Sequence, residues 1–405
     1  MSRSKGPLAP NKVVHVTECL AAGTLTFLLQ ITQELAAGGL QQVLIYSRRP
    51  DTPANVEALF GGGVKLLEIA SPKAGLGRYF ARLREVMLEQ CETLDETAFH
   101  LHSSKAGFVG RMALLGLRRM PRVFYSPHGL SFLNRRLLLP SLAFAGLEWL
   151  ASRVPATLVG CSRSEARLLG RLAGRPARVL ENAVDDSFFG ITRRESEMPL
   201  VVSMGRICYQ KAPELFAAMA TRFQIAETRA RFVWIGDGDA EGEALLRAAG
   251  VTVTGWVGRD DVQRLLGEAS LYVQTSRWEG MPLSVLQALA AGVPCVVTDA
   301  VGNRDAVRQG LTGYVVGSSD ELLMAVRRLL SRPVLRGRMA QAARRDAQER
   351  FSSASFRERL WRLYGLHDTA ADARAETSGK LLAFSRRASR ISQEALEPAR
   401  HASRV

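Results

Sequence analysis

Short runs of β-branched and other apolar residues alternate with longer stretches of helical periodicity along most of the chain. An apolar run at 13–17 is followed by a helical stretch at 24–37. The later apolar runs of this half are 43–46, 64–69, 98–102, 123–126 and 157–160. This alternation predicts βαβ units, and therefore a parallel sheet with helices on both faces.

A polar stretch at 181–198 interrupts the alternation, and a second series of apolar runs follows it, at 200–204, 232–235, 251–254, 271–274 and 295–297. The sequence therefore predicts an α/β protein with two Rossmann-like domains. The expected parts are an N-terminal extension 1–11, a first domain 12–182, a linker 183–198, a second domain 199–350, a C-terminal helix 351–366 and a flexible basic tail 367–405. Because ligands of open parallel sheets bind beyond the carboxyl ends of the strands, we expect the domains to face a central cleft.

Composition agrees with a folded, soluble chain. Of the 405 residues, 47% are hydrophobic and 23% are charged, which excludes collagen-like, disulfide-scaffold and wholly disordered classes. The five cysteines are scattered without a Cys-x-x-Cys pair, so we expect a reducing, cytoplasmic location. The longest apolar stretch, 137–151, is shorter than the roughly 20 residues of a spanning helix, and no export signal is expected.

The chain is strongly basic, with a net charge of +15, which favours an anionic partner. Residues 105–178 contain 13 Lys and Arg but only two acidic residues, which leaves +11 in this segment. Apolar residues accompany these cations at 134–150, so peripheral docking on the anionic inner face of the cell membrane is one hypothesis. A core helix with a charged edge explains the pattern equally well. The sequence contains no recognition-helix or zinc motif of nucleic-acid-binding proteins, so we expect no nucleic acid as a partner.

The most informative segment is SRWEGMPLSVLQALAAGVP, residues 276–294, where an apolar run is followed by a helix. Glu279 stands on the predicted loop, Pro282 suits the first helical position, and Gln287 follows two helical turns later. An anion or sugar hydroxyls could bind the free amides of the helix start, at Gly280, Met281, Leu283 and Ser284. The alternative is an ordinary helix end that Glu279 stabilises.

A second candidate segment is SMGRICYQKAPELF, residues 203–216. An apolar run ends at Gly205, a helix is predicted from Pro213, and Arg206 and Lys211 lie between them. Two cations at the carboxyl end of a strand could neutralise a diphosphate. Solvated surface charges are the alternative.

Two further positions follow strand ends in the first half. His128 comes just after the run at 123–126, and Gly23 stands between the first apolar run and its helix, where a missing side chain would admit a phosphate or an acceptor. A packed structural histidine and ordinary helix punctuation are the alternatives.

The segment WIGDGDAEG, residues 234–242, contains glycines in a spacing similar to a dinucleotide fingerprint. Asp237 and Asp239 would, however, place negative charge where a pyrophosphate binds, so we predict no nicotinamide site. Since no further ligands surround these aspartates in the sequence, we also predict no metal site.

Together these segments resemble the retaining glycosyltransferases of family 4, which have the two-domain GT-B fold and use nucleotide sugars. The resemblance covers about 12–366 and is strongest over 201–333. The segments HSSKAGFVGR, 102–111, and SPHG, 126–129, are similar to N-terminal parts of members that build bacterial surface polysaccharides. The resemblance implies that Arg206 and Lys211 hold the donor diphosphate, that Glu279 through Ser284 contact the donor sugar and ribose, and that His128 contacts the sugar.

The resemblance therefore implies a hexosyltransferase with His128 and Glu279 as catalytic residues. Its donor would be a UDP- or GDP-sugar, its acceptor a lipid-linked glycan of lipopolysaccharide or exopolysaccharide synthesis, and it would need no metal cofactor. The sequence departs from the family at Gln287, where a second Glu is usual, and at 300–307, where Asp305 stands near a usual Glu and receives no role. The alternatives are a nucleotide-sugar isomerase or hydrolase of the same fold, and a non-catalytic protein that binds nucleotide sugars or nucleic acid.

Overall fold

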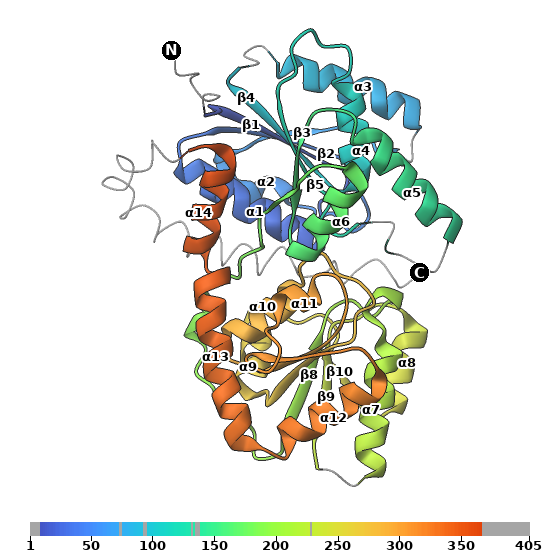
Figure 1. Ribbon diagram of the computed structural model, residues 1–405, viewed down its shortest axis with the longest axis vertical. Coiled ribbons are helices and arrows are strands. Elements are labelled where there is room, and N and C mark those ends of the chain that lie inside the picture. The colour runs from blue at the N-terminus through green and yellow to red at the C-terminus, as the bar shows by residue number, and fades with distance from the viewer. Residues whose placement is uncertain are drawn as a thin grey trace. The chain divides into compact units, whose positions relative to one another are not determined.

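The computed structural model describes residues 9–72, 75–91, 95–130, 133, 138–226 and 229–366. They form two compact units, shown in Figure 1. Unit 1 takes its described residues from Met1–Cys161, Glu165–Leu180 and Arg357–Val405, and unit 2 consists of Ser162–Ser164 and Glu181–Phe356. The predicted tail, 367–405, and residues 1–8 of the predicted extension lie outside the described residues.

Unit 1 contains a parallel sheet of seven strands in the order β3-β2-β1-β4-β5-β6-β7. Its strands are β1 (Lys12–Thr17), β2 (Gln41–Tyr46), β3 (Lys65–Glu68), β4 (Thr97–His102), β5 (Arg122–Ser126), β6 (Thr157–Gly160) and β7 (Arg178–Val179). The helices are α1 (Ala22–Ala37), α2 (Val56–Phe60), α3 (Leu76–Glu89), α4 (Ser104–Ala113), α5 (Leu138–Ala151) and α6 (Arg163–Ala173), and most of α14 (Ser353–Tyr364) also belongs to this unit. A short 3-10 helix, η1, covers Gly61–Gly63.

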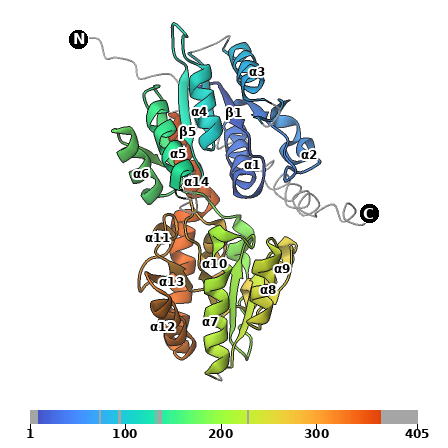
Figure 2. The same ribbon diagram turned by 90° about the vertical axis from the view of Figure 1, so that its right-hand side faces the viewer.

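The two faces of this sheet differ in chemistry because successive side chains of a strand point in opposite directions. One face is apolar and packs with α3 and α4, through residues such as Val14, Leu101 and Leu83. Figure 2 shows α4 beside α5. The alternate positions of β1 and β4 include three histidines, His15, His100 and His102, and His100 hydrogen-bonds Tyr364 of α14.

Unit 2 contains a parallel sheet of six strands in the order β10-β9-β8-β11-β12-β13. Its strands are β8 (Leu200–Met204), β9 (Arg231–Ile235), β10 (Thr252–Val253), β11 (Leu271–Gln274), β12 (Cys295–Thr298) and β13 (Gly313–Val316). The helices are α7 (Pro213–Ile225), α8 (Ala240–Ala248), α9 (Arg259–Glu268), α10 (Leu283–Ala290), α11 (Asn303–Ala306), α12 (Ser319–Leu330) and α13 (Pro333–Phe351), with 3-10 helices η4 (Asp186–Gly190) and η5 (Tyr209–Lys211).

The core of unit 2 fills one face of its sheet with side chains of α7, α8 and α12, including Phe216, Leu246 and Val326. Helix α10 packs with α13, and strands and helices alternate as the sequence predicts, although β7 and β13 correspond to no predicted apolar run. The α/β class with two Rossmann-like sheets is thus confirmed. The segment 183–198, predicted as a linker, contains η4, whose Phe188 and Phe189 are buried. Among the described residues, no helix has the length and apolar character to span a bilayer.

Candidate functional site

The loop after β8 brings a lysine back over the end of its own strand. Gly205 has φ of +140°, and a Cβ placed there would lie 2.9 Å from Lys211 Cε. Ala212, which follows that lysine, has a left-handed φ of +49° and begins the turn into α7. Thr275 Oγ1 donates to the Lys211 carbonyl at 2.8 Å, which ties this loop to the end of β11. A side chain at Gly205 would therefore push Lys211 out of place.

Lys211 meets Glu279 at this edge of the sheet. The ammonium nitrogen lies 2.7 Å from Glu279 Oε1, and the carboxylate is buried. The same oxygen accepts hydrogen bonds from Ser276 Oγ at 2.6 Å and from Gln274 Nε2 at 3.0 Å, while Gln210 Nε2 lies 3.4 Å from Oε2. Neutral donors and one cation thus hold the carboxylate in a fixed orientation.

Arg206, the other predicted cation of this loop, has a different environment. Its side chain is exposed and has no hydrogen bond or ion pair with the residues that the structure describes. Of the two cations that follow β8, Arg206 is therefore unpaired among the described residues, and Lys211 is paired with a carboxylate.

Helix α10 begins one residue later than the sequence predicts, because Pro282 is the N-cap residue and Leu283 the first helical one. The amides of Gly280 and Met281, before the helix, and of Leu283 and Ser284, at its start, have no acceptor in the described part of the chain, whereas the Val285 amide donates to the Pro282 carbonyl. Glu279 does not cap them, since its carboxylate accepts from Lys211 and its neighbours instead. The free amides and the helix dipole can still receive an anion or a hydroxyl oxygen.

Gln287 lies in the middle of α10 and is half-buried. Its side chain makes no hydrogen bond to any described residue, whereas Asn182 Nδ2 fixes the start of the helix by donating to the Met281 carbonyl at 3.1 Å. The amide of Gln287 is thus available to a ligand.

The loop after β12 holds the backbone of Glu279 in place, a contact that the sequence analysis did not predict. The Glu279 amide donates to the Val301 carbonyl at 3.0 Å, and a Cβ on Gly302 would lie 2.5 Å from the Gly280 carbonyl. Asp305 on the same loop accepts from the Ser164 amide at 3.0 Å. The family-like glycine turn at 300–307 therefore works here as a backbone support.

The glycine segment 234–242 also proves structural. Cβ atoms on Gly236 and Gly238 would lie 2.4 Å from the Gly205 carbonyl and 2.2 Å from the Ile207 carbonyl. Asp239 is the N-cap of α8 and accepts from the Gly242 amide at 3.3 Å. These glycines allow the segment to pack directly against the loop that carries Arg206 and Lys211.

Unit 1 contains the other predicted positions. Gly23 lies inside the first turn of α1, so its predicted place between strand and helix was wrong, and a Cβ there would meet no atom within 4 Å. The left-handed residue of this turn is Ala22, with φ of +46°. His128 follows β5 with φ of +54°, and Glu165 fixes the next residue by accepting from the Gly129 amide at 2.7 Å.

His128 is one of four histidines that gather in unit 1, an arrangement that the sequence analysis missed. His102 Nδ1 lies 3.0 Å from His128 Nε2, and His102 Nε2 lies 3.1 Å from His15 Nδ1. His100 sits beside them, its ring centroid 4.1 Å from that of His102. Burial lowers the pKa of His15 and of His128 to about 4, and it lowers the pKa of His100 and of His102 well below the usual value. The cluster is therefore neutral at physiological pH.

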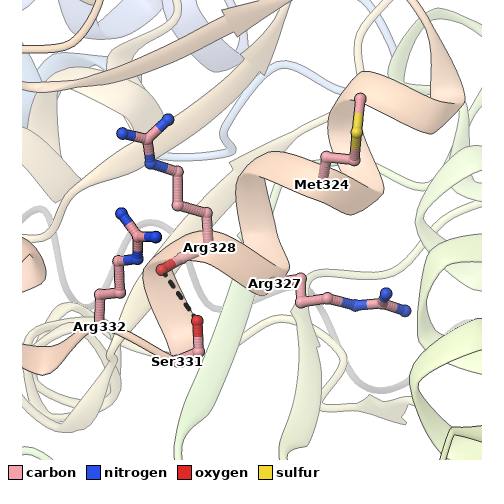
Figure 3. A pocket seen from close by; sticks show the side chains of 5 residues that line it. All are labelled: Met324, Arg327, Arg328, Ser331 and Arg332. Carbon is pink, nitrogen blue, oxygen red and sulfur yellow. Dashed lines mark hydrogen bonds between the residues drawn. The ribbon is translucent and has the colours of Figure 1, made fainter.

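A hollow on the surface of unit 2 lies at the end of α12 (Figure 3). Met324, Arg327, Arg328, Ser331 and Arg332 line it. In Figure 3 the Arg327 side chain points away from those of Arg328 and Arg332, so the guanidinium groups do not converge on one ligand position. Arginines at the end of a helix favourably oppose its dipole, which explains them without a ligand.

Two family models match most of both units. The model described as Glycosyltransferase Family 4 matches residues 21–188, and the model described as Glycosyl transferases group 1 matches residues 198–332. A curated relative, the UDP-Gal:alpha-D-GlcNAc-diphosphoundecaprenol alpha-1,3-galactosyltransferase of Escherichia coli, is 28% identical over 249 residues. The match covers 55% of this chain and 62% of that enzyme, so the chain spans less than two thirds of the relative's length.

Solved structures share the fold. Sucrose-phosphate synthase from Thermosynechococcus elongatus has a TM-score of 0.75 at 16% identity, over 89% of this chain and 100% of that one. Anabaena HepE in complex with UDP-glucose has a TM-score of 0.69 at 16% identity, over 87% and 99% of the two chains. Two Rossmann-like sheets of this kind define the GT-B class of glycosyltransferase architecture. The chain belongs to glycosyltransferase family 4.

Proposed function

We propose that this protein is a retaining glycosyltransferase that moves a hexose from a nucleotide sugar to a glycan acceptor in polysaccharide synthesis. The observation that carries this proposal is the ion pair of Lys211 and Glu279, placed at a carboxyl edge of parallel strands beside the free amides that start α10. A cation next to a fixed carboxylate can receive the charged and the hydroxylated parts of one ligand.

In the proposed reaction, the bond between the anomeric carbon and the phosphate oxygen breaks, and its electron pair goes to the diphosphate. The acceptor hydroxyl forms the new bond on the same face of the sugar and gives its proton to the departing phosphate oxygen. Arg206, Lys211 and the amides of Gly280 to Ser284 stabilise the charge on the leaving group. Glu279 and His128 orient the sugar hydroxyls. Because side chains and amides supply the positive charge, we expect transfer to persist in EDTA.

We propose a UDP-sugar as the first donor to test. The named substrate of the Escherichia coli relative is UDP-Gal, and HepE was solved with UDP-glucose. The amide of Gln287 can donate hydrogen bonds to ribose hydroxyls or accept them, whereas the second carboxylate that is usual in the family would only accept them, with charge assistance. We therefore expect UDP to bind measurably but less tightly than it would with Glu at this position.

We propose a lipid-linked acceptor, which the relative's diphosphoundecaprenol substrate supports. Helix α5 offers a surface that could meet such an acceptor at an anionic membrane. Glu148 fixes its inner side through Arg111, whose Nη2 lies 3.0 Å from Oε2. Large apolar side chains of the same helix are exposed, with Leu142 at 69%, Trp149 at 48% and Leu150 at 49%.

Charge complements this apolar face. The segment 105–178 has a net charge of +11, and Arg153 lies over the Trp149 ring at 4.2 Å from its centroid. Cations next to exposed Trp and Leu favour an anionic lipid surface. Sedimentation with phosphatidylglycerol vesicles should show binding that salt weakens, and Trp149→Ser with Leu150→Ser should reduce it, whereas Leu245→Ser on α8 should not. Equal recovery in the supernatant with anionic and with neutral vesicles would remove the membrane proposal.

A donor panel tests the proposed activity. Purified protein is incubated with UDP-, GDP- and ADP-sugars, with and without a lipid-linked glycan, and released nucleotide and glycan product are measured. We expect nucleotide release that depends on the acceptor, and a product whose anomeric configuration matches that of the donor. Release without acceptor would show an isomerase or hydrolase, and the absence of both release and binding would refute a nucleotide-sugar enzyme.

A further inference from the structure

Three of the clustered histidines form an in-line chain through unit 1. The ring centroids of His15 and His102 lie 5.3 Å apart while their nearest nitrogens lie 3.1 Å apart, so the rings meet edge to edge. His102 and His128 repeat this geometry, with centroids 5.3 Å apart, nitrogens 3.0 Å apart and ring planes 12° from parallel. Each pair of facing nitrogens therefore shares one proton in a hydrogen bond.

The buried end of the chain is at Gln42. Its Nε2 donates to the Thr32 carbonyl at 2.8 Å, which fixes the orientation of the amide and leaves Oε1 as an acceptor. Gln42 Oε1 and His15 Nε2 are both buried, and neither atom has a hydrogen-bond partner of ordinary geometry among the described residues. Burial lowers the pKa of His15, and the hydrogen-bonding interaction with Gln42 opposes that shift. The two atoms are thus natural partners, with His15 Nε2–H as the donor.

This end condition sets the direction of every hydrogen bond in the chain. A neutral imidazole has one N–H and one lone pair. If His15 donates from Nε2, its Nδ1 accepts from His102 Nε2–H, and His102 Nδ1 then accepts from His128 Nε2–H. The remaining nitrogen, His128 Nδ1, carries a lone pair.

His128 Nδ1 is the end of the chain that a ligand can reach. The residue is only half-buried, and its Nδ1 has no partner in the described part of the chain and is not among the buried unpaired atoms. We propose that Gln42, His15 and His102 are positioning residues that keep His128 Nδ1 unprotonated, so that His128 accepts a hydrogen bond from a carbohydrate hydroxyl. The second half of this proposal rests on the proposed function, whereas the first half does not.

A metal site is the competing explanation for clustered histidines, because nitrogens of His15, His100 and His102 lie within 4.8 Å of one another. Zinc binds imidazole nitrogens tetrahedrally at about 2.0–2.1 Å, so two ligand nitrogens lie roughly 3.3 Å apart and their lone pairs converge on the metal, whereas the facing nitrogens of His15 and His102 point at each other. The nitrogens of His15 and His102 are 3.1 Å apart. His100 already uses both nitrogens, with Tyr364 Oη and Ser126 Oγ each at 2.8 Å. The geometry favours shared protons.

Nitrogen-15 NMR of the full chain with labelled histidine tests the proposal without any ligand. Long-range proton–nitrogen correlations distinguish the two neutral tautomers, and His→Gln variants assign the signals. We expect His15, His102 and His128 all to be protonated at Nε2. Protonation of His128 at Nδ1, or a shift of the His15 and His102 nitrogens on addition of equimolar Zn²⁺, would overturn the proposal.

Variants at Gln42 test its control over the chain. Gln42→Met removes the acceptor, and Gln41→Met makes the same substitution at the exposed neighbour on β2. Gln42→Met should mix the tautomers of His128 and lower kcat/KM for sugar transfer about fivefold, with UDP affinity unchanged. Gln42→Glu, which restores an acceptor oxygen, should restore protonation of all three histidines at Nε2. Gln41→Met should change neither the tautomers nor kcat/KM. An unchanged His128 tautomer in folded Gln42→Met would overturn the role of Gln42.

The tautomer measurement and the transfer assay together distinguish a failure of this proposal from a failure of the proposed function. If the tautomers are as expected but no donor and acceptor react, the hydrogen-bonded chain stands and the glycosyltransferase activity fails. If transfer occurs but His128 is protonated at Nδ1, the activity stands and the positioning chain fails.

Discussion

Lys211 would have two competing partners under the proposed function, the Glu279 carboxylate and a donor diphosphate. Glu279 is 7% exposed and accepts from Lys211 Nζ at 2.7 Å, as well as from Ser276 and Gln274. Lys211→Met leaves this carboxylate with neutral donors alone. Removal of one partner from a fully buried pair costs 3–5 kcal/mol, but the remaining donors and the 17% exposure of the Lys211 side chain reduce the expected loss of stability to about 2 kcal/mol.

Nucleotide binding should distinguish the two members of the pair. Lys211→Met removes a charge-assisted hydrogen bond to the diphosphate, worth about 1.5–3 kcal/mol, so the Kd for UDP should rise roughly ten- to hundredfold. Glu279→Gln removes the competing carboxylate and should leave UDP binding as tight as in the wild type or tighter, while sugar transfer falls.

Calorimetric titration with UDP measures both effects, and urea unfolding measures the stability term. Lys65→Met, at an exposed lysine of β3, is the matched control and should change neither quantity. Wild-type UDP affinity in Lys211→Met would refute a contact between Lys211 and the diphosphate. If Glu279→Gln weakened UDP binding as much as Lys211→Met does, Lys211 would serve only as the counterion of a structural carboxylate.

Four further predictions concern His15, Gly236, Asp239 and Gln287. Because the pKa of His15 is lowered to about 4, the folded protein binds fewer protons than the unfolded chain below pH 6.5. His15 should therefore lower the free energy of unfolding, measured by urea titration, by about 2 kcal/mol between pH 7 and pH 5. An unfolding free energy that does not change with pH would contradict the burial of His15. Gly236→Ala should cost more than about 2 kcal/mol and weaken UDP binding, since its Cβ would meet the Gly205 carbonyl at 2.4 Å. Gly337→Ala, inside α13 with no atom within 4 Å of its Cβ, should be tolerated in both assays. Asp239→Ala should cost about 1 kcal/mol as a lost N-cap and leave the Kd for UDP unchanged, and a large change in that Kd would return Asp239 to the binding site. Gln287→Glu should lower the Kd for UDP several-fold in calorimetry, and weaker binding would argue against a ribose contact.

Much of the fold could be predicted because buried parallel strands appear as apolar runs. The strand at Gly313–Val316 was missed because glycines surround it, yet Gly313 is required there, since a Cβ would lie 1.8 Å from the Cys295 carbonyl. The strands at Arg178–Val179 and Thr252–Val253 have only two residues each. Periodicity cannot define the limits of elements of that length.

The site was harder to predict because it depends on which strands are neighbours. Lys211 and Glu279 are 68 residues apart, and they meet because β8 pairs with β11. The four clustered histidines belong to three separate apolar runs or their ends, and only the sheet order β1-β4-β5 brings these together. Local sequence patterns predicted which residues carry reactive groups and that these residues follow the carboxyl ends of strands. The sheet order, which local patterns do not predict, determined which of them are in contact.

The route of the chain has a consequence for how this protein can be made and divided. The peptide leaves unit 1 after Leu180 and returns at Arg357, where Arg122 Nη2 donates to the Tyr364 carbonyl and the Tyr364 hydroxyl completes the environment of His100. The core of unit 1 is therefore complete only after α14 has been synthesised, almost two hundred residues after Leu180. A fragment that ends at Leu180 lacks α14 and would expose the histidine cluster to water. A well-packed unit 1 therefore requires α14 to be joined to this fragment.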